Sequence, residues 1–129
     1  MTTWTSGELR KIEAAEEMEL AALRRDGTLG NPVTIWVVGV GDDLYVRSWK
    51  GRASSWFRAT QLRYEGHIRA GGVDKDVSFV MAADDHLNDQ IDAAYRTKYR
   101  HHDVRWVNPM VAPTARATTI KLVPRSTPA

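Results

Sequence analysis

The sequence predicts a single, mainly β domain of the α+β class that spans residues 1–129. Short runs of β-branched and aromatic residues, bounded by glycine, proline and aspartate turns, recur through the middle of the chain. Helical patterns stand near the start, in the middle and before the final strand. With 43% hydrophobic and 26% charged residues, the composition is ordinary for a globular protein with its own core.

The first helix is predicted to begin after Thr5. Glu8 follows three residues later, which makes a capping box in which each residue's side chain accepts from the other's backbone N–H. Trp4 precedes the cap and Leu9 stands at the position that packs against it, so an apolar contact fixes the entry of the chain. Leu9 and Ile12 share the face expected to be buried.

Residues 18–25 (MELAALRR) allow two interpretations. Their helix propensity extends the first helix to Arg25. If they form a strand instead, the loop at residues 26–32 becomes a hairpin connection into the next strand. The residues alone leave this choice open.

The first clear hairpin lies at residues 33–49. Residues 33–40 (VTIWVVGV) form the clearest strand and are apolar on both faces, which predicts a central strand or one that crosses a barrel wall. Residues 41–43 turn the chain, and residues 44–49 return as the antiparallel partner.

A short helix and a second hairpin follow. Ser54 or Ser55 caps the helix, which runs to about Tyr64. Two further strands are predicted at residues 66–70 and 75–81, joined across a Gly-Gly turn.

The last helix is predicted to begin at the Asp84–Asp85 pair and to end near Tyr99. An apolar stripe runs along it, and acidic residues early and basic residues late match the helix dipole. Residues 101–113 are predicted to be irregular, because Pro109 and Pro113 oppose regular structure there. A strand at residues 117–123 closes the fold.

Basic residues are concentrated in the middle of the chain. Between Leu44 and Lys75 there are seven basic and two acidic residues, although the whole chain carries a net charge of only +2. The seven are Arg47, Lys50, Arg52, Arg58, Arg63, Arg69 and Lys75. The modest total charge argues against nucleic acid as a partner. A weaker alternative interpretation is that the basic residues of this window, with the aromatic residues among them, bind nucleic acid.

The basic window surrounds a predicted helix start, where free backbone N–H groups favour an anion and arginine forks match phosphate oxygens. A phosphate-bearing planar cofactor is therefore expected there, with stacking aromatic residues beside it. The residues proposed to bind it are Arg47, Ser48, Arg52, Trp56, Phe57 and Arg58, with help from Lys75. The alternative is an ordinary solvated surface whose arginines pair with nearby acids.

The other tryptophans and the histidines have simpler expected roles. Trp36 is expected in the core, and Trp106 over a pocket or a partner. His101 and His102 are treated as neighbours on one strand that point to opposite faces without a third ligand, so no metal is expected. His67 is predicted to be a hydrogen-bonded histidine of the barrel wall.

Several classes of function are excluded or disfavoured. The chain has no cysteine, which removes disulfides, thiolate nucleophiles and cysteine metal sites and fits a cytoplasmic location. No Gly-x-Ser-x-Gly elbow or pair of catalytic acids is present. The N-terminus has no basic segment followed by an apolar one, so no signal peptide is expected, and no apolar run is long enough to span a bilayer.

The segments DDLYVRSWKGR and SWFRATQLRYEGHIRAGG resemble the core of the flavin- and deazaflavin-binding split barrels. The motifs PVTIWVV, LYVRSWKGR, WFR, EGHIRAGGVDKDV and ARATTIKLVPR resemble more closely the bacterial family called domain of unknown function 2255, which is grouped with those barrels. The resemblance implies a six-stranded antiparallel split β-barrel with about three helices. It also implies a homodimer with sites between the subunits.

The resemblance further implies that residues 18–25 form the first strand and that Arg24 and Arg25 lie in a turn that contacts cofactor phosphate. The cofactor would be FMN or deazaflavin, and the protein would be an oxidoreductase that uses it for hydride transfer to a small organic substrate. Deazaflavin enzymes carry a Gly-Arg-Lys-Ser-Gly-like turn, whereas this chain has Asp26, which opposes a phosphate. The alternative is a non-enzymatic barrel that has lost the cofactor and binds another ligand or partner.

Overall fold

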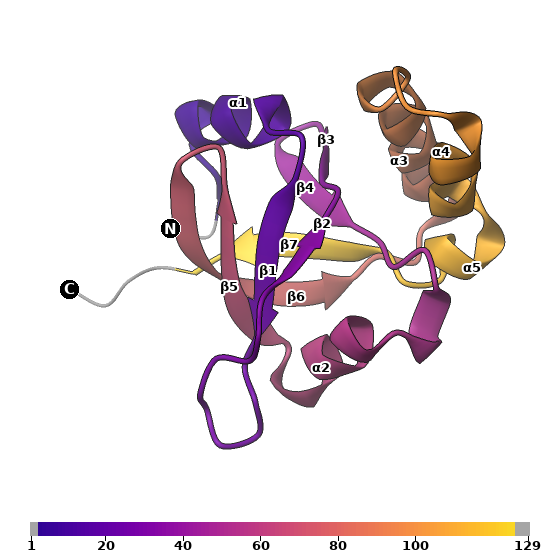
Figure 1. Ribbon diagram of the computed structural model, residues 1–129. Helices are drawn as coiled ribbons and strands as arrows, with labels where there is room; N and C mark the ends of the chain where they lie inside the picture. The colour runs from indigo at the N-terminus through magenta and orange to yellow at the C-terminus, as the bar shows by residue number, and fades with distance from the viewer. Residues whose placement is uncertain (1–2, 126–129) are drawn as a thin grey trace.

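The computed structural model describes residues 3–125, and within this range it contains seven strands in one antiparallel sheet and five α-helices (Figure 1). The strands are β1 Met18–Ala22, β2 Val33–Ile35, β3 Val38–Val40, β4 Asp43–Val46, β5 Glu65–Ala70, β6 Val73–Met81 and β7 Ile120–Pro124. The helices are α1 Ser6–Ala14, α2 Ser55–Arg63, α3 Asp85–Lys98, α4 Val104–Val111 and α5 Pro113–Arg116, with a 3₁₀ turn at Gly51–Ala53. Within residues 3–125, none of these helices combines the length and the apolar character that crossing a membrane demands.

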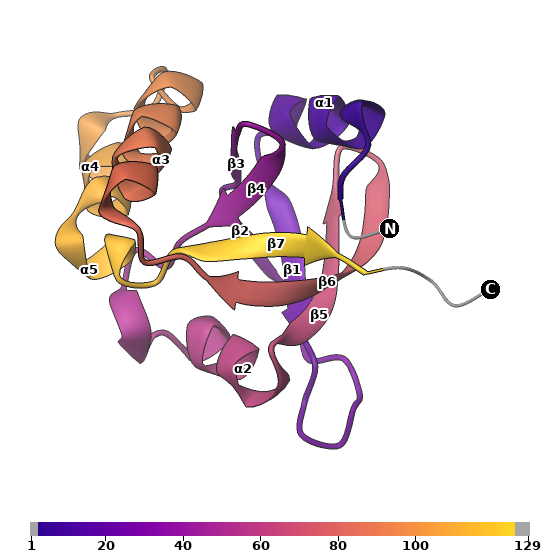
Figure 2. The same ribbon diagram turned by 180° about the vertical axis from the view of Figure 1, so that it is seen from behind.

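The strand order β2-β1-β5-β6-β7-β4-β3 places two consecutive strands at opposite edges of the sheet. The sheet curls so that these edges belong to one extended segment, in which Trp36 and Val37 connect β2 to β3 (Figures 1 and 2). The predicted strand at residues 33–40 thus pairs with β1 through its first half and with β4 through its second half. The sheet has seven strands where six were predicted because this one strand is interrupted.

Polar groups at the end of α3 cause the interruption. The backbone N–H of Val37 donates to Tyr99 Oη at 3.1 Å, and its carbonyl accepts from Lys98 Nζ at 2.7 Å. Val37 is fully buried, so its backbone groups must be paired, and here side chains replace the neighbouring strand. The predicted strand crosses the barrel wall at this point.

The core has two parts, separated by the sheet. Inside the barrel lie inward-facing residues of most strands, such as Leu44, Ile68 and Leu122. On the outer face, Tyr45 packs with buried residues of α3 and α4, including Tyr95. Alternation along β4 sends successive side chains to the two clusters. Each fully buried large apolar side chain contributes about 1.5–3 kcal/mol relative to exposure.

The first helix has the predicted capping box, in which Glu8 N donates to Thr5 Oγ1 at 3.1 Å and Thr5 N donates to Glu8 Oε1 at 2.9 Å. Leu9 and Ile12 are buried against the barrel, and Trp4 Nε1 donates to the carbonyl of Leu122 at 2.9 Å. The N-terminal segment is thereby fixed to the last strand.

Residues 18–22 form a strand, as the family resemblance implies. β1 pairs with β2 on one side and with β5 on the other. Met18 and Leu20 point inward and Glu19 is exposed, a period of two that suits a strand. Pairing on both edges outweighs the helix propensity of these residues.

The prediction that residues 101–113 are irregular was wrong, because α4 and α5 occupy most of this segment. The side chain of Asp103 caps α4 by accepting from Arg105 N at 3.0 Å. Val107 and Met110, three residues apart, are both buried, and their packing offsets the hydrogen bond that Pro109 cannot make. Pro113 is the first residue of α5, where a missing N–H costs nothing.

Candidate ligand-binding site

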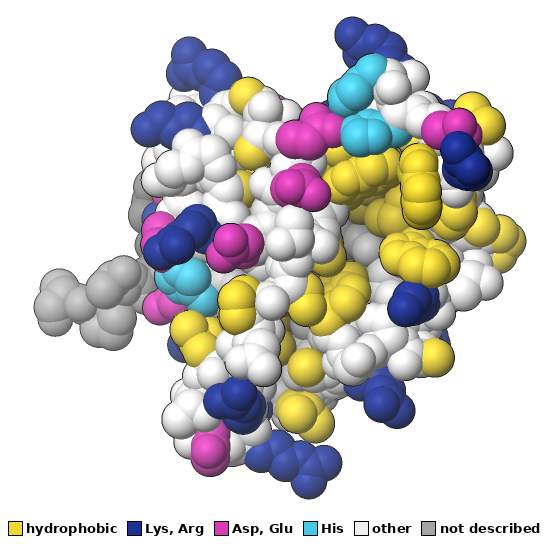
Figure 3. All heavy atoms as spheres, viewed as in Figure 1, with side chains coloured by type: hydrophobic (Ala, Val, Ile, Leu, Met, Phe, Trp, Pro, Cys, Tyr) yellow, Lys and Arg dark blue, Asp and Glu magenta, His cyan; other side chains and the backbone are white. Residues whose placement is uncertain are grey.

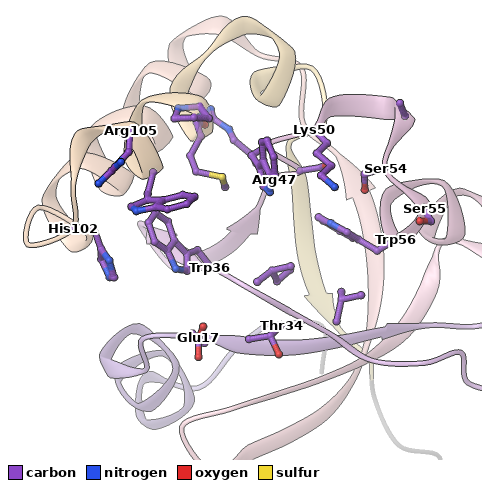
Figure 4. A pocket seen from close by; sticks show the side chains of 18 residues that line it. Glu17, Thr34, Trp36, Arg47, Lys50, Ser54, Ser55, Trp56, His102 and Arg105 are labelled. Carbon is purple, nitrogen blue, oxygen red and sulfur yellow. The ribbon is translucent and has the colours of Figure 1, made fainter.

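A cavity of about 690 Å³ lies between the barrel and the helices of its outer face. Four segments form its walls: β2 with Trp36, the chain that leaves β4 at residues 47–50, the start of α2, and α4 with the turn before it. Apolar side chains gather around this hollow on the surface (Figure 3). One side of the cavity holds Trp36, His102 and Arg105, and the opposite side holds Lys50, Ser54, Ser55 and Trp56 (Figure 4).

Four of the five tryptophans of the chain line this cavity: Trp36, Trp49, Trp56 and Trp106. Two of them are fixed by neighbours, since Trp36 stacks on Tyr99 with ring centroids 3.9 Å apart and Trp56 meets Phe57 edge-on at 6.4 Å. The other two, Trp49 and Trp106, are 58% and 62% exposed. The cavity therefore offers aromatic faces to a planar ligand from several sides.

Ser48 places an unpartnered hydroxyl in the cavity wall. The residue is 1% exposed, and among the described residues its Oγ has no hydrogen-bond partner. Its backbone is paired, because Ser48 N donates to Thr118 Oγ1 at 2.8 Å and Gly51 N donates to Ser48 O at 3.0 Å. A buried polar atom without a partner costs about 1–3 kcal/mol, and a polar atom of a ligand in the cavity would remove this cost.

The first turn of α2 opens onto the cavity. Ser54 caps the helix by accepting from Phe57 N at 3.3 Å. The N–H groups of Ser55 and Trp56 belong to the part of a helix that has no intrahelical acceptor. These N–H groups and the helix dipole favour an anion at this end of the cavity.

The charged side chains at the cavity are few. Lys50 lies near the start of α2, with Nζ 5.3 Å from the ring centroid of Trp49. Arg105 lies on the α4 side, where its Nε is 3.4 Å from Asp103 Oδ2. Glu17 is the one carboxylate among the described lining residues. The balance of charge favours a ligand with a negative group.

Arg47 lines the cavity, but its guanidinium is bound within the protein. Nε donates to Thr119 Oγ1 at 2.9 Å, and Nη1 donates to Asp92 Oδ1 at 2.5 Å and to the Met110 carbonyl at 2.9 Å. Nη2 donates to the carbonyl and the side-chain oxygen of Asn88 at 3.2 and 2.8 Å. Arg47 is 1% exposed and joins β4 to α3, α4 and the residue before β7. It supports the wall of the cavity and presents no free fork to a phosphate.

Three other residues of the predicted site lie close in sequence but have different surroundings. Arg52 is exposed and donates to the carbonyl of Ala117 at 3.2 Å. Phe57 is 2% exposed and belongs to the barrel core. Arg58 is exposed on α2 and does not line the cavity. Of the predicted cluster at the helix start, Ser48 and Trp56 thus line the cavity beside Arg47.

The remaining three predicted ligand-binding residues are not among those that line the cavity: Arg24, Arg25 and Lys75. The turn after β1 is satisfied internally, since Arg24 donates to the Leu29 carbonyl at 3.0 Å and Thr28 N donates to Asp26 Oδ1 at 3.0 Å. Hydrogen bonds from Thr28 hold the pKa of Asp26 below its usual value. Lys75 pairs with Glu8 of α1 at 3.0 Å.

Sequence reasoning missed the contribution of the α4 segment to the cavity. Trp106 was expected over a pocket or a partner, and it lines the cavity, but Arg105 and Met110 were not anticipated. The signal was present in the aspartate cap at position 103 and in the spacing of Val107 and Met110. Pro109 and Pro113 obscured this helical signal, because proline is unfavourable inside a helix.

The histidine predictions had mixed outcomes. His67 on β5 is hydrogen-bonded in the barrel wall, as predicted, with its Nδ1 2.7 Å from Asp76 Oδ1 across the hairpin. The premise that His101 and His102 point to opposite faces of a strand was wrong. They follow α3, and the Nε2 atoms of both face the same carboxylate oxygen of Glu16.

Comparisons with known proteins give a family and a fold. The model of a family described as "Uncharacterized protein conserved in bacteria (DUF2255)" matches residues 8–122. No curated protein matches the sequence.

Three solved structures share the fold. They are the heme storage protein HutZ from Vibrio cholerae (13% identity, TM-score 0.67, covering 95% of this chain and 91% of that one), an F420 reductase (15%, 0.58, 97% and 97%) and an FAD-binding protein from Mesorhizobium loti (19%, 0.54, 95% and 89%). At these identities the likeness establishes the mainly β barrel fold and confirms that prediction.

Proposed function

We propose that this chain, which belongs to the bacterial DUF2255 family, binds a planar aromatic cofactor of the flavin type, FMN or deazaflavin, in its tryptophan-lined cavity. The observation that carries the proposal is the joint presence of four tryptophans, the unpartnered Ser48 hydroxyl and the start of α2 around one space. The names of the similar structures, which speak of heme, F420 and FAD, support a cofactor with a large flat ring.

The residues present fit such a group. Trp36 and Trp56, whose rings are fixed by neighbours, would hold the ring system, and Trp106 would cover it. A phosphate would be held by Lys50 and by the free N–H groups at the start of α2. This assignment keeps the predicted location of the anion but replaces Arg47 as its cation.

Bound in this way, the cofactor would supply hydride-transfer chemistry for an oxidoreductase acting on a small organic substrate. The chain's part is to orient the ring and to limit the access of water through its apolar wall. No side chain is needed as an acid or a base, which agrees with a cavity lined mostly by aromatic and small residues.

The proposal includes a homodimer in which a second copy of the chain packs over the opening of this cavity. Trp49, Trp106 and Val104 are all more than half exposed, and Trp49 and Trp106 line the cavity itself. Aromatic residues are enriched where proteins meet. A second copy that covers this face would also enclose the cofactor.

A non-enzymatic ligand-binding barrel is the second candidate. The internally satisfied turn after β1, in which Asp26 accepts from both the N–H and the hydroxyl of Thr28, favours it. Arg24, one of the two arginines predicted to contact a phosphate from this turn, instead donates to the Leu29 carbonyl within the turn.

Titration of the purified protein with FMN, with deazaflavin and with hemin, followed by tryptophan fluorescence, tests the proposal. We expect strong quenching by FMN or deazaflavin, because four of the five tryptophans line the cavity. Trp56→Ala should weaken binding, whereas Arg58→Gln, an exposed change on the same helix, should leave it unchanged. If only hemin bound, the cavity would be a site for a porphyrin ring, and the flavin proposal would be wrong. The absence of a fluorescence response to all three compounds would also overturn the proposal.

A further inference from the structure

We propose that Glu16, His101 and His102 form a binding site for a divalent transition-metal ion at the rim of the cavity. One ring nitrogen from each histidine and one carboxylate oxygen of Glu16 lie within 4.8 Å of one another. His101 Nε2 is 3.1 Å from Glu16 Oε1, and His102 Nε2 contacts the same oxygen. Three ligand atoms therefore converge from two segments that are 85 and 86 residues apart.

The ligands lie where two loops meet, and one tyrosine holds these loops together. Glu16 lies between α1 and β1, and the histidines lie between α3 and α4. Tyr99 Oη donates to the carbonyl of Glu16 at 2.9 Å, and His102 N donates to the carbonyl of Tyr99 at 3.0 Å. Tyr99 is fully buried, so it fixes the backbone of both ligand segments in the way that outer-shell groups orient metal ligands.

The His102 ring is also held by aromatic contacts. Its centroid is 4.9 Å from that of Trp36 and 5.9 Å from that of Tyr99. The two histidine rings are 4.4 Å apart and tilted by 42°, which lets both Nε2 atoms reach one point. The ligand side chains are part-exposed, at 32% for His102, 49% for Glu16 and 60% for His101, so an ion has access from solvent.

The ligand set selects a class of ion. Two imidazoles and one carboxylate suit Zn²⁺, Co²⁺, Ni²⁺ or Cu²⁺, whereas Mg²⁺ and Ca²⁺ prefer sets made of oxygen. The nearby Asp103 is occupied by the α4 cap and by Arg105, so three protein ligands leave a position for water or another ligand. Because His102 lines the cavity, the ion would add positive charge at its rim (Figure 4).

The metal site does not depend on the cofactor proposal, so metal alone can test it. Untagged protein, freed of metal with a chelator, is titrated with Zn²⁺ by calorimetry and with Co²⁺ by visible absorption. We expect one ion per chain, Co²⁺ bands typical of nitrogen and oxygen ligands, and a rise in the thermal midpoint, because the ion links the two loops in the folded state only.

Variants identify the ligands. Loss of an outer-shell partner commonly weakens metal binding by about 10–100-fold, so His102→Gln and Glu16→Gln should each weaken it at least tenfold. Glu16→Gln keeps both histidines, and all three ligands are exposed enough for the variants to fold. His86→Gln, an exposed histidine in the first turn of α3, is the matched control and should bind as the wild type does. Zn²⁺ binding that is unchanged in the His101→Gln/His102→Gln double variant, or no binding by the wild type, would overturn the proposal.

Discussion

Two cations on the same stretch of chain have opposite environments at the cavity. Arg47, behind the wall, is 1% exposed and directs its guanidinium to five acceptors within the protein. Lys50, three residues later, lies at the rim in contact with the ring of the exposed Trp49. The first region holds the barrel to its helices, and the second is open to a ligand.

The difference teaches that a cation near a helix start is no guide to anion binding until its partners are known. Asp92, which accepts from Arg47 and also from Arg116 at 2.5 Å, lies on α3, far away in sequence. A basic window read from the sequence therefore mixes structural and ligand-facing residues. The predictions below separate the two, beginning with the largest expected effect.

Removing the buried cation should cost the most stability. Arg47→Met removes one of the two arginines that pair with Asp92 and one of the two donors to Asn88 Oδ1, and breaking a buried pair typically costs about 3–5 kcal/mol. Urea unfolding measures the change in the free energy of unfolding. Arg58→Met, the same change at an exposed position of α2, should stay within about 0.5 kcal/mol. Equal effects of the two variants would mean that the buried contacts of Arg47 do not stabilise the fold.

Removing an aromatic ring at the rim should affect binding and not folding. Trp106 is 62% exposed, so Trp106→Ala should leave stability almost unchanged. Stacking on one aromatic side chain contributes about 1–3 kcal/mol, so the affinity for FMN should fall roughly fivefold or more. The control is Asn108→Ala on the same helix, at an exposed position that does not line the cavity. A Trp106→Ala protein that binds FMN normally would mean that the ring lies elsewhere.

Ser48, which lies between Arg47 and Lys50 in the chain, allows an effect on stability to be distinguished from an effect on ligand binding. Because the Ser48 hydroxyl has no partner, Ser48→Ala should leave the stability of the unliganded protein unchanged or slightly raised. If a ligand satisfies the hydroxyl, the same change should lower its affinity by about 1 kcal/mol, or roughly fivefold. Ser54→Ala, in contrast, should lower the stability of the unliganded protein by about 0.5–2 kcal/mol, because Ser54 caps α2. Thermal unfolding and FMN titration of both variants distinguish these outcomes.

The smallest effect concerns a charge contact on the barrel surface, which contrasts with the buried pair at Arg47. Burial acts to lower the pKa of His67, but the carboxylates of Asp76 and Asp74 outweigh it and raise that pKa above 6.5. The resulting stabilisation is complete below pH 6.5 and is lost as the pH rises through the raised value.

His67→Gln should therefore reduce stability at pH 5.5 and have less effect at pH 8, by less than about 1 kcal/mol. Urea midpoints at the two pH values measure the difference. His86→Gln, at an exposed position of α3, should not change the pH profile. A larger loss at pH 8 than at pH 5.5 would contradict the assigned protonation.

The sequence predicted the local features of this fold well. The caps at Thr5, Ser54 and Asp84 each accept from an N–H three residues later, so the whole interaction lies within one helical turn. The hairpin of β5 and β6 follows in the same way from alternation and the Gly-Gly turn between them. Such contacts can be predicted from the sequence because both partners lie close together in the chain.

The sequence alone determined where α1, α2 and α3 begin, that the segments of β5 and β6 pair as a hairpin, and that aromatic and basic residues gather around the start of α2. Only the tertiary structure decided that side chains at the end of α3 bind the backbone of Val37 and interrupt the strand. It also decided that the guanidinium of Arg47 is bound by acceptors within the protein and that Glu16 contacts two histidines. The physical reason is separation along the chain. The partners of Arg47 lie 41 to 72 residues away and Glu16 lies 85 from His101, and nothing local indicates which acceptor a donor will meet after the barrel closes.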